Sequence, residues 1–162
     1  MVVRFNEGGV KGTIVRTQCS RASDMDQPVP ERASKERDGG GTETILLVED
    51  EPGVRRSVER VLRAYGYTVV TAEDGLAALE WCRARPGEAD LVLSDLIMPR
   101  MSGYRLYQSL REEFGAVRFV LMSGYGDRRV EGGKPLDAEI PLLEKPWALS
   151  ELLTTVRRVL DG

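Results

Sequence analysis

The side chains best suited to chemistry stand where short apolar runs of the chain end. The apolar run 91–93 leads into Ser94 and Asp95, and Pro99 follows too soon for a central strand to continue. Other apolar runs end in Glu49 and Asp50, in Ser123, and in Lys145. Parallel strands end on one edge of their sheet, and ligands bind in the crevice outside their carboxyl ends. We therefore expect these side chains to converge in a single pocket.

The electrostatics of such a pocket restrict what it can hold. Carboxylates of Asp50 and Asp95 about 4 Å apart would repel each other by roughly 4 kcal/mol at an effective dielectric constant near 20. A cluster of this kind needs a shared proton or a cation. Mg²⁺ suits two carboxylates, a backbone carbonyl and several waters. With a hydroxyl from Ser123 and an ammonium from Lys145, the set is typical of a site for a phosphoryl group in transfer.

The elements that must position these residues are strands alternating with helices. Helical spacing of apolar residues follows Pro52, Asp74 and Ser102 and surrounds Ser150, with only a weak helical signal at 127–130. The runs expected as strands are 45–48, 67–71, 91–95, 119–122 and 140–143. The alternation predicts an α/β fold, a doubly wound five-stranded parallel sheet with helices on both faces, from about Thr42 to Gly162.

Composition narrows the class of protein. The chain has 162 residues, of which 41% are hydrophobic and 30% charged, and its net charge is -3. Nucleic-acid binding has no electrostatic support. No membrane span or leader signal is evident, so we expect a cytoplasmic protein without membrane partners. The two cysteines, Cys19 and Cys82, are too few for a disulfide framework, and Cys82 lies on an apolar helical face where packing is its expected role.

The sequence contains no histidine. This excludes Ser-His and Cys-His nucleophiles and any histidine-ligated metal. A phosphohistidine donor would therefore belong to another molecule. Residues 1–41 combine Pro28, Pro30 and three consecutive glycines with scattered charges, and we expect a mostly disordered tail or linker before the domain at 42–162.

Four short motifs on the right strand ends resemble the receiver domain of two-component response regulators. They are Leu47-Val48-Glu49-Asp50-Glu51, Ser94-Asp95-Leu96-Ile97-Met98-Pro99, Met122-Ser123-Gly124-Tyr125 and Lys145-Pro146. The resemblance covers Thr42 to about Asp161. It implies the flavodoxin-like strand order 2-1-3-4-5.

By this resemblance Asp95 is the phosphoacceptor, which takes a phosphoryl group from the phosphohistidine of a partner histidine kinase or histidine phosphotransfer protein. The resemblance also implies a Mg²⁺ site, with Asp50 as a direct ligand and Glu49 as a direct or water-mediated one. Asp95 itself and the backbone carbonyl of Ile97 complete the implied protein ligands.

The same resemblance assigns roles to the remaining strand ends. Ser123 would hydrogen-bond a phosphoryl oxygen, Gly124 would let the backbone approach, and Lys145 would pair with another oxygen. The peptide bond from Lys145 to Pro146 is expected to be cis. The implied function is a self-phosphorylating signalling receiver that switches partner binding, with no kinase or DNA-binding output domain expected in this chain and with a weak homodimer left open.

Two features depart from the usual receiver pattern. Leu142 stands three residues before Lys145, where receivers commonly carry Tyr or Phe, so Trp147 or Tyr125 would have to replace that aromatic ring. Residues 132–135 interrupt the weak fourth helix. Both features look most like the C-terminal receivers of hybrid histidine kinases.

Two other functions stay open at this point. One is an interaction module of the same fold that works without phosphorylation. The other is a phosphatase or phosphotransferase with an aspartyl-phosphate intermediate, but Ile97 stands where haloacid-dehalogenase enzymes carry a second aspartate. Because neither Ile97 nor Tyr125 can act as a base at neutral pH, we also expect a slowly hydrolysing phosphoaspartate.

Overall fold

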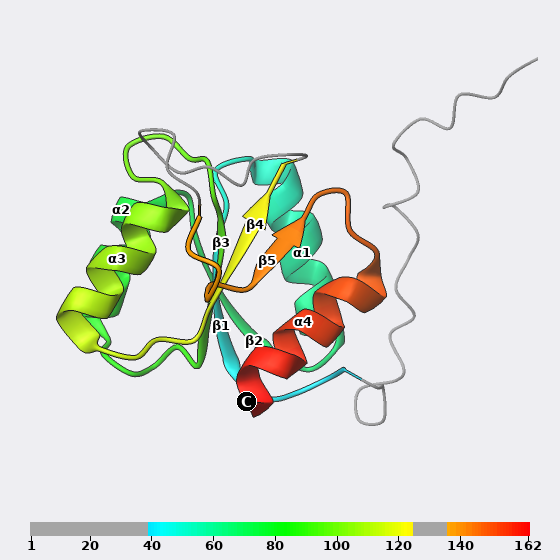
Figure 1. Cartoon of the computed structure of the whole chain (residues 1–162). Helices are drawn as coiled ribbons and strands as arrows, with labels where there is room; N and C mark the ends of the chain where they lie inside the picture. The colour runs from blue at the N-terminus through cyan, green and yellow to red at the C-terminus, as the bar shows by residue number, and fades with distance from the viewer. Residues whose placement is uncertain (1–38, 125–135) are drawn as a thin grey trace, which may run out of the picture.

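The computed structural model describes residues 39–124 and 136–162, and these form a parallel sheet flanked by helices (Figure 1). In chain order the elements are β1 (Thr44–Val48), α1 (Pro52–Ala64), β2 (Thr68–Ala72), α2 (Gly75–Ala84), β3 (Leu91–Asp95), α3 (Gly103–Phe114), β4 (Phe119–Ser123), β5 (Leu142–Glu144) and α4 (Leu149–Asp161). The strands lie in the order β2-β1-β3-β4-β5, all parallel, which confirms the expected doubly wound flavodoxin-like fold. The weak helical signal at 127–130, its interruption at 132–135 and residues 1–38 lie outside the described residues.

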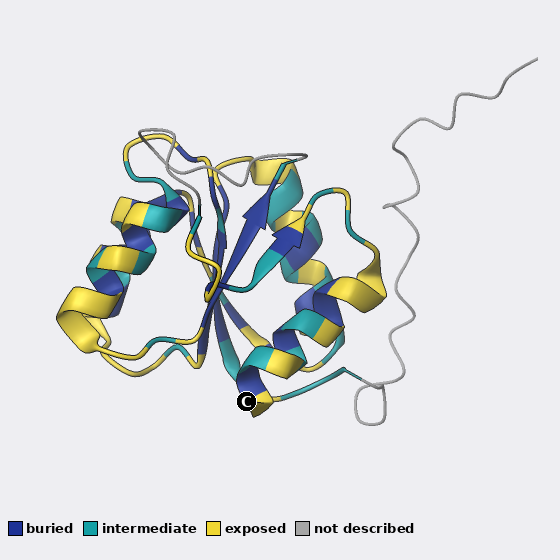
Figure 2. Ribbon diagram, in the orientation of Figure 1, coloured by how far each residue is buried: buried dark blue, intermediate teal, exposed yellow. Residues whose placement is uncertain are grey.

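The strands contribute side chains to two separate hydrophobic cores, one on each face of the sheet. Side chains alternate across a strand, so Ile45 and Leu47 face the core beneath α1 and α4, whereas Leu46 and Val48 face the core beneath α2 and α3. Figure 1 shows these two helix pairs on opposite sides of the sheet, and Figure 2 shows buried residues along the strands and on the inner helix faces. Burial on both faces explains why β1 is a continuous apolar run rather than an alternating one.

Helices α1, α2 and α3 begin at the residues that the sequence indicates. Asp74 caps α2 by accepting a hydrogen bond from the backbone N–H of Ala77 at 2.8 Å, and Ser102 caps α3 from the N–H of Arg105 at 3.4 Å. Pro52 is the first residue of α1, where its missing N–H costs no intrahelical bond. No helix among the described residues is long and apolar enough to cross a membrane.

Two expectations at the ends of elements need correction. The last strand begins at Leu142 rather than at Ile140, because Pro141 has no N–H for the ladder and joins the sheet only through its carbonyl, which accepts from Leu121 at 2.9 Å. The helical spacing of apolar residues after Ser102 predicts that Phe114 shares one face with Leu106 and Leu110, but Phe114 is the last residue of α3 and is 41% exposed. Cys82 is buried in the α2–α3 core, as expected for a packing role.

The segment before β1 is fastened to α4 by a polar network. The hydroxyl of Tyr67 donates to the carbonyl of Gly39 at 2.9 Å, and Arg157 donates to the carboxylate of Glu43 at 2.8 Å. Arg157 also pairs with Asp161 one turn further along α4. Partial burial acts to raise the pKa of Glu43, but the hydrogen bond from Arg157 and backbone hydrogen bonds outweigh it and hold that pKa below its usual value.

Candidate functional site

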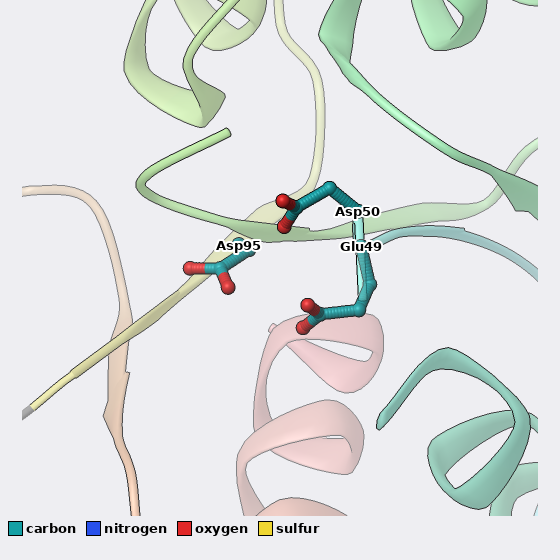
Figure 3. A group of neighbouring side chains, drawn as sticks. All are labelled: Glu49, Asp50 and Asp95. Carbon is teal, nitrogen blue, oxygen red and sulfur yellow. The ribbon is translucent and has the colours of Figure 1, made fainter. Parts of the chain in front are cut away.

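Three carboxylates meet at the carboxyl edge of the sheet (Figure 3). Glu49 and Asp50 follow β1, and Asp95 is the last residue of the neighbouring strand β3. The parallel register pairs Val48 with Ser94, so the residues that follow emerge side by side. One oxygen from each carboxylate lies within 4.8 Å of the others. The structure therefore brings the three acidic residues singled out in the sequence into one cluster.

Lys145 supplies the ammonium of this cluster. Its Nζ donates to Oδ2 of Asp95 at 2.7 Å and to Oε2 of Glu49 at 2.9 Å. The Glu49 side chain is only 2% exposed, whereas those of Asp95 and Lys145 are 14% and 26% exposed. Lys145 directly follows β5, which pairs with β4, so its side chain crosses over the end of β4 to reach β3 and β1. Ion pairs thus join the ends of three strands.

The pKa values of Glu49 and Lys145 are each set by opposing influences. Burial raises the pKa of Glu49 above its usual value; the hydrogen bond from Lys145 opposes this shift, and the charge of Asp95 reinforces it. Burial alone would lower the pKa of Lys145, but its hydrogen bonds to Asp95 and Glu49 outweigh burial, and the pKa is raised. Lys145 therefore stays a cation at neutral pH, and burial works against the ionised form of Glu49.

Arg55 is a residue at this site that the sequence reasoning missed. From the first turns of α1 its guanidinium donates to the backbone carbonyl of Glu49 and, at 3.2 Å, to that of Asp50. A cation near a helix N-terminus opposes the helix dipole. An arginine at this unfavourable helix position, a few residues after Glu49 and Asp50, is the sequence signal that could have indicated a bonding partner outside the helix.

Ser123 ends β4 and is 1% exposed. Its hydroxyl donates to the carbonyl of Gly124 at 2.9 Å, and its own carbonyl accepts from the backbone N–H of Lys145 at 2.7 Å. The structure therefore places the hydroxyl and the lysine on adjacent strand ends. The Lys145–Pro146 peptide bond is cis, as the resemblance implied.

The backbone around Asp95 is closely packed. The N–H of Ile97 donates to Oδ1 of Asp95 at 3.4 Å, while the Ile97 side chain is exposed. A methyl group added to Gly103, the first residue of α3, would lie 2.1 Å from the carbonyl oxygen of Asp95 and 2.8 Å from the hydroxyl of Ser94. Only glycine lets α3 begin directly against the end of β3.

Trp147 does not take the place left by Leu142. Leu142 packs against the core beneath α2 and α3, whereas Trp147 packs against the core beneath α1 and α4, on the other face of the sheet. Tyr125, the other candidate, lies outside the described residues.

The donor set of the acidic cluster fits a hard divalent cation. Carboxylate oxygens from Glu49, Asp50 and Asp95 converge, and Lys145 is the one ammonium that binds these carboxylates among the described residues. The cluster thus retains an excess of negative charge when its carboxyls are ionised. Oxygen ligands with spare negative charge are what Mg²⁺ prefers.

A family model for the response regulator receiver domain matches residues 45–157. The chain therefore belongs to the response regulator receiver family, whose members act in two-component systems and interact with histidine kinases or phosphotransfer proteins.

Individual relatives agree with this family. The sensor kinase CckA of Brucella abortus is 39% identical over 142 residues, which are 87% of this chain and 15% of that kinase. The crystal structure of the receiver domain from hybrid histidine kinase CckA is 37% identical, with a TM-score of 0.60 over 72% of this chain and 98% of that one. The response regulator TrrA from Thermotoga maritima, in complex with Mg²⁺-BeF, is 28% identical, with a TM-score of 0.63 over 73% of this chain and 99% of that one. The expected likeness to hybrid-kinase receivers is confirmed, and the chain spans only a small part of the full-length kinase.

Proposed function

We propose that this chain is the phosphoacceptor of a two-component phosphorelay. Asp95 takes a phosphoryl group from a phosphohistidine of a partner histidine kinase or phosphotransfer protein, and the modified domain changes its affinity for partners. The observation that carries the proposal is the placement of Asp95. It is a partly exposed carboxylate that shares one edge of the sheet with two further carboxylates and with Lys145 at 2.7 Å.

The step forms one bond and breaks one. A carboxylate oxygen of Asp95 attacks phosphorus, the bond from phosphorus to the imidazole nitrogen of the donor breaks, and that nitrogen keeps the electron pair and then binds a proton. Little covalent chemistry is asked of the protein, because positioning and charge neutralisation dominate phosphoryl transfer.

The neighbours of Asp95 supply that neutralisation. Lys145 already lies within hydrogen-bond distance of the acceptor, so its ammonium can follow the negative charge onto a phosphoryl oxygen. Ser123 ends the adjacent strand and has a hydroxyl that can exchange its hydrogen bond to Gly124 for one to the phosphoryl group. Both movements would pull the ends of β4 and β5 towards β3. The negative charge added at Asp95 would in this way alter the surface that the domain presents to its partners.

Glu49, Asp50, Asp95 and the carbonyl of Ile97 would hold Mg²⁺, which when bound neutralises the phosphoryl oxygens. The convergence of the three carboxylates and the bound Mg²⁺-BeF reported for the TrrA regulator support this assignment. Arg55 holds the backbone of Glu49 and Asp50 by donating hydrogen bonds to their carbonyls.

The test is phosphorylation of the full chain with acetyl phosphate and MgCl₂, followed by intact-mass measurement. We expect one phosphoryl group per chain, lost in Asp95→Asn and after chelation of the metal. The matched control is Asp90→Asn, which changes a carboxyl just before the other end of the same strand, where it accepts from the N–H of Thr44. This control should still be phosphorylated.

Phosphorylation of Asp95→Asn to the wild-type extent would refute the assignment of the acceptor. A chain that accepts phosphoryl groups but binds its partner kinase equally well in both states would refute the switching part of the proposal. Multiple turnovers of a small phosphoester would instead favour a phosphatase.

A further inference from the structure

The loop between β3 and α3, residues 96–102, carries Ile97 and is anchored at its far side by Arg100. The Arg100 guanidinium contacts Oδ2 of Asp74 and lies 3.0 Å from Oε1 of Glu73, both of which precede α2. Arg100 has φ of 64°, a left-handed conformation that side chains other than glycine rarely adopt. The backbone is therefore turned at the residue whose side chain reaches back to α2.

Asp74 is a fixed partner for this arginine. It is 1% exposed, and its other oxygen, Oδ1, caps α2 by accepting from the N–H of Ala77 at 2.8 Å. A buried carboxylate needs a cation or several hydrogen bonds to stay ionised. Arg100, whose side chain is 55% exposed, closes this site from the surface.

A second contact joins the same two segments. A methyl group added to Gly75, the first residue of α2, would lie 2.7 Å from the carbonyl oxygen of Met101 and 2.8 Å from its side chain. Two residues after Met101, Gly103 approaches the carbonyl of Asp95 more closely still, at 2.1 Å for an added methyl group. The loop is thus held against α2 on one side and against the acceptor strand on the other.

We propose that Arg100 is a positioning residue for the metal site. Its ion pair with Asp74 holds the 96–102 loop so that the backbone of Ile97 stays beside Asp95, and this sets the affinity of the site for a divalent cation. The inference rests on the proposed Mg²⁺ site, to which it adds α2 as a structural support. Arg100 would touch neither the metal nor the phosphoryl group.

The test measures binding of MgCl₂ to the full chain by isothermal titration calorimetry, beside urea unfolding of each variant. We expect Arg100→Ala to weaken Mg²⁺ binding by about tenfold. Arg100→Lys should recover part of the loss, because a lysine keeps the charge but is shorter than the arginine, whose Nη2 contacts both carboxylates. The double variant Arg100→Ala with Asp74→Asn removes the pair without leaving a buried charge, and it should show the same weakened binding in a stable fold.

The matched control is Arg83→Ala. Arg83 pairs with Glu113 across α2 and α3 and has a similar exposure of 52%, but it lies away from the 96–102 loop. It should change Mg²⁺ binding less than about twofold. If Arg83→Ala lost as much Mg²⁺ affinity as Arg100→Ala, or if the double variant bound Mg²⁺ as tightly as the wild type, the role of Arg100 would be refuted. Either result would leave the proposed function untouched. Absence of Mg²⁺ binding in the wild type would overturn the metal part of the proposed function as well.

Discussion

Replacement of Gly103 by alanine tests the close contact between α3 and the acceptor strand. The added methyl carbon would lie 2.1 Å from the carbonyl oxygen of Asp95 and 2.9 Å from Cδ2 of Leu121. The first distance is more than about 1 Å shorter than ordinary van der Waals contact. The carbonyl is part of the β3 backbone and cannot swing away, whereas the Leu121 atom is the end of a side chain that is fully buried in the core. Overpacking of this kind costs about 1–3 kcal/mol, against a gain of up to about 1 kcal/mol from the helix preference of alanine.

We therefore expect Gly103→Ala to lower the free energy of unfolding by about 1–2 kcal/mol in urea titrations, which is the overpacking cost less the gain in helix preference. Because the displaced atom belongs to Asp95, the variant should also bind Mg²⁺ more weakly. Gly53→Ala is the matched control. Gly53 lies in the first turn of α1, and the nearest atom to an added methyl group is 3.8 Å away, so this variant should be as stable as the wild type or slightly more stable. Equal stability of the two variants would show that α3 can move off the strand freely, which would refute the reasoning.

Three further results are expected. Ile97→Asn should hydrolyse its phosphoaspartate faster, by about tenfold, because a polar side chain beside the acceptor can orient water that isoleucine excludes; an unchanged decay of the phosphorylated mass would contradict this. Lys145→Met leaves the carboxylate of Glu49 buried without its ammonium, so the already raised pKa of Glu49 should rise further. Since a raised carboxyl pKa makes the folded state bind protons more tightly, stability should fall as pH increases through that pKa, by up to about 3–5 kcal/mol; a flat urea midpoint between pH 4 and 8 would contradict this. The pH dependence due to Glu43 has the opposite sign, because the pKa of Glu43 is lowered in the folded state. The stability that Glu43 contributes is present above its pKa in the unfolded chain and is lost as pH falls through its pKa in the folded state, by up to about 1 kcal/mol. Arg157→Met should remove this loss of stability in acid, as measured by thermal unfolding across the acid range.

Much of the architecture follows from the sequence because each strand is short, apolar and closed by a polar residue. The alternation of elements indicates a parallel sheet, and the parallel sheet in turn places Asp50, Asp95 and Lys145 at one edge before any distance is known. The N-caps at Asp74 and Ser102 could be predicted for a local reason, because each side chain satisfies a backbone N–H only three residues away.

Contacts between distant segments could not be predicted in the same way. Nothing near Arg100 in the chain indicates that it binds Asp74, and nothing near Gly103 indicates that the carbonyl of Asp95 fills the space of its missing side chain. The position of Trp147 was equally hidden, because a turn through Pro146 decides which face of the sheet the ring packs against. Such features depend on the packing of one element on another, which periodicity does not encode.

The position of Lys145 has a consequence for which ions the site would accept. Its ammonium is a counter-ion tethered to the fold, and it occupies one oxygen each of Glu49 and Asp95. A free monovalent ion brings no more charge than this resident one, and it must also give up its own water. A divalent ion brings twice the charge to the same oxygens and can share them with the lysine. The proposed site would therefore bind divalent cations in preference to monovalent ones. Potassium or sodium at ordinary ionic strength should compete poorly with a divalent cation for these oxygens.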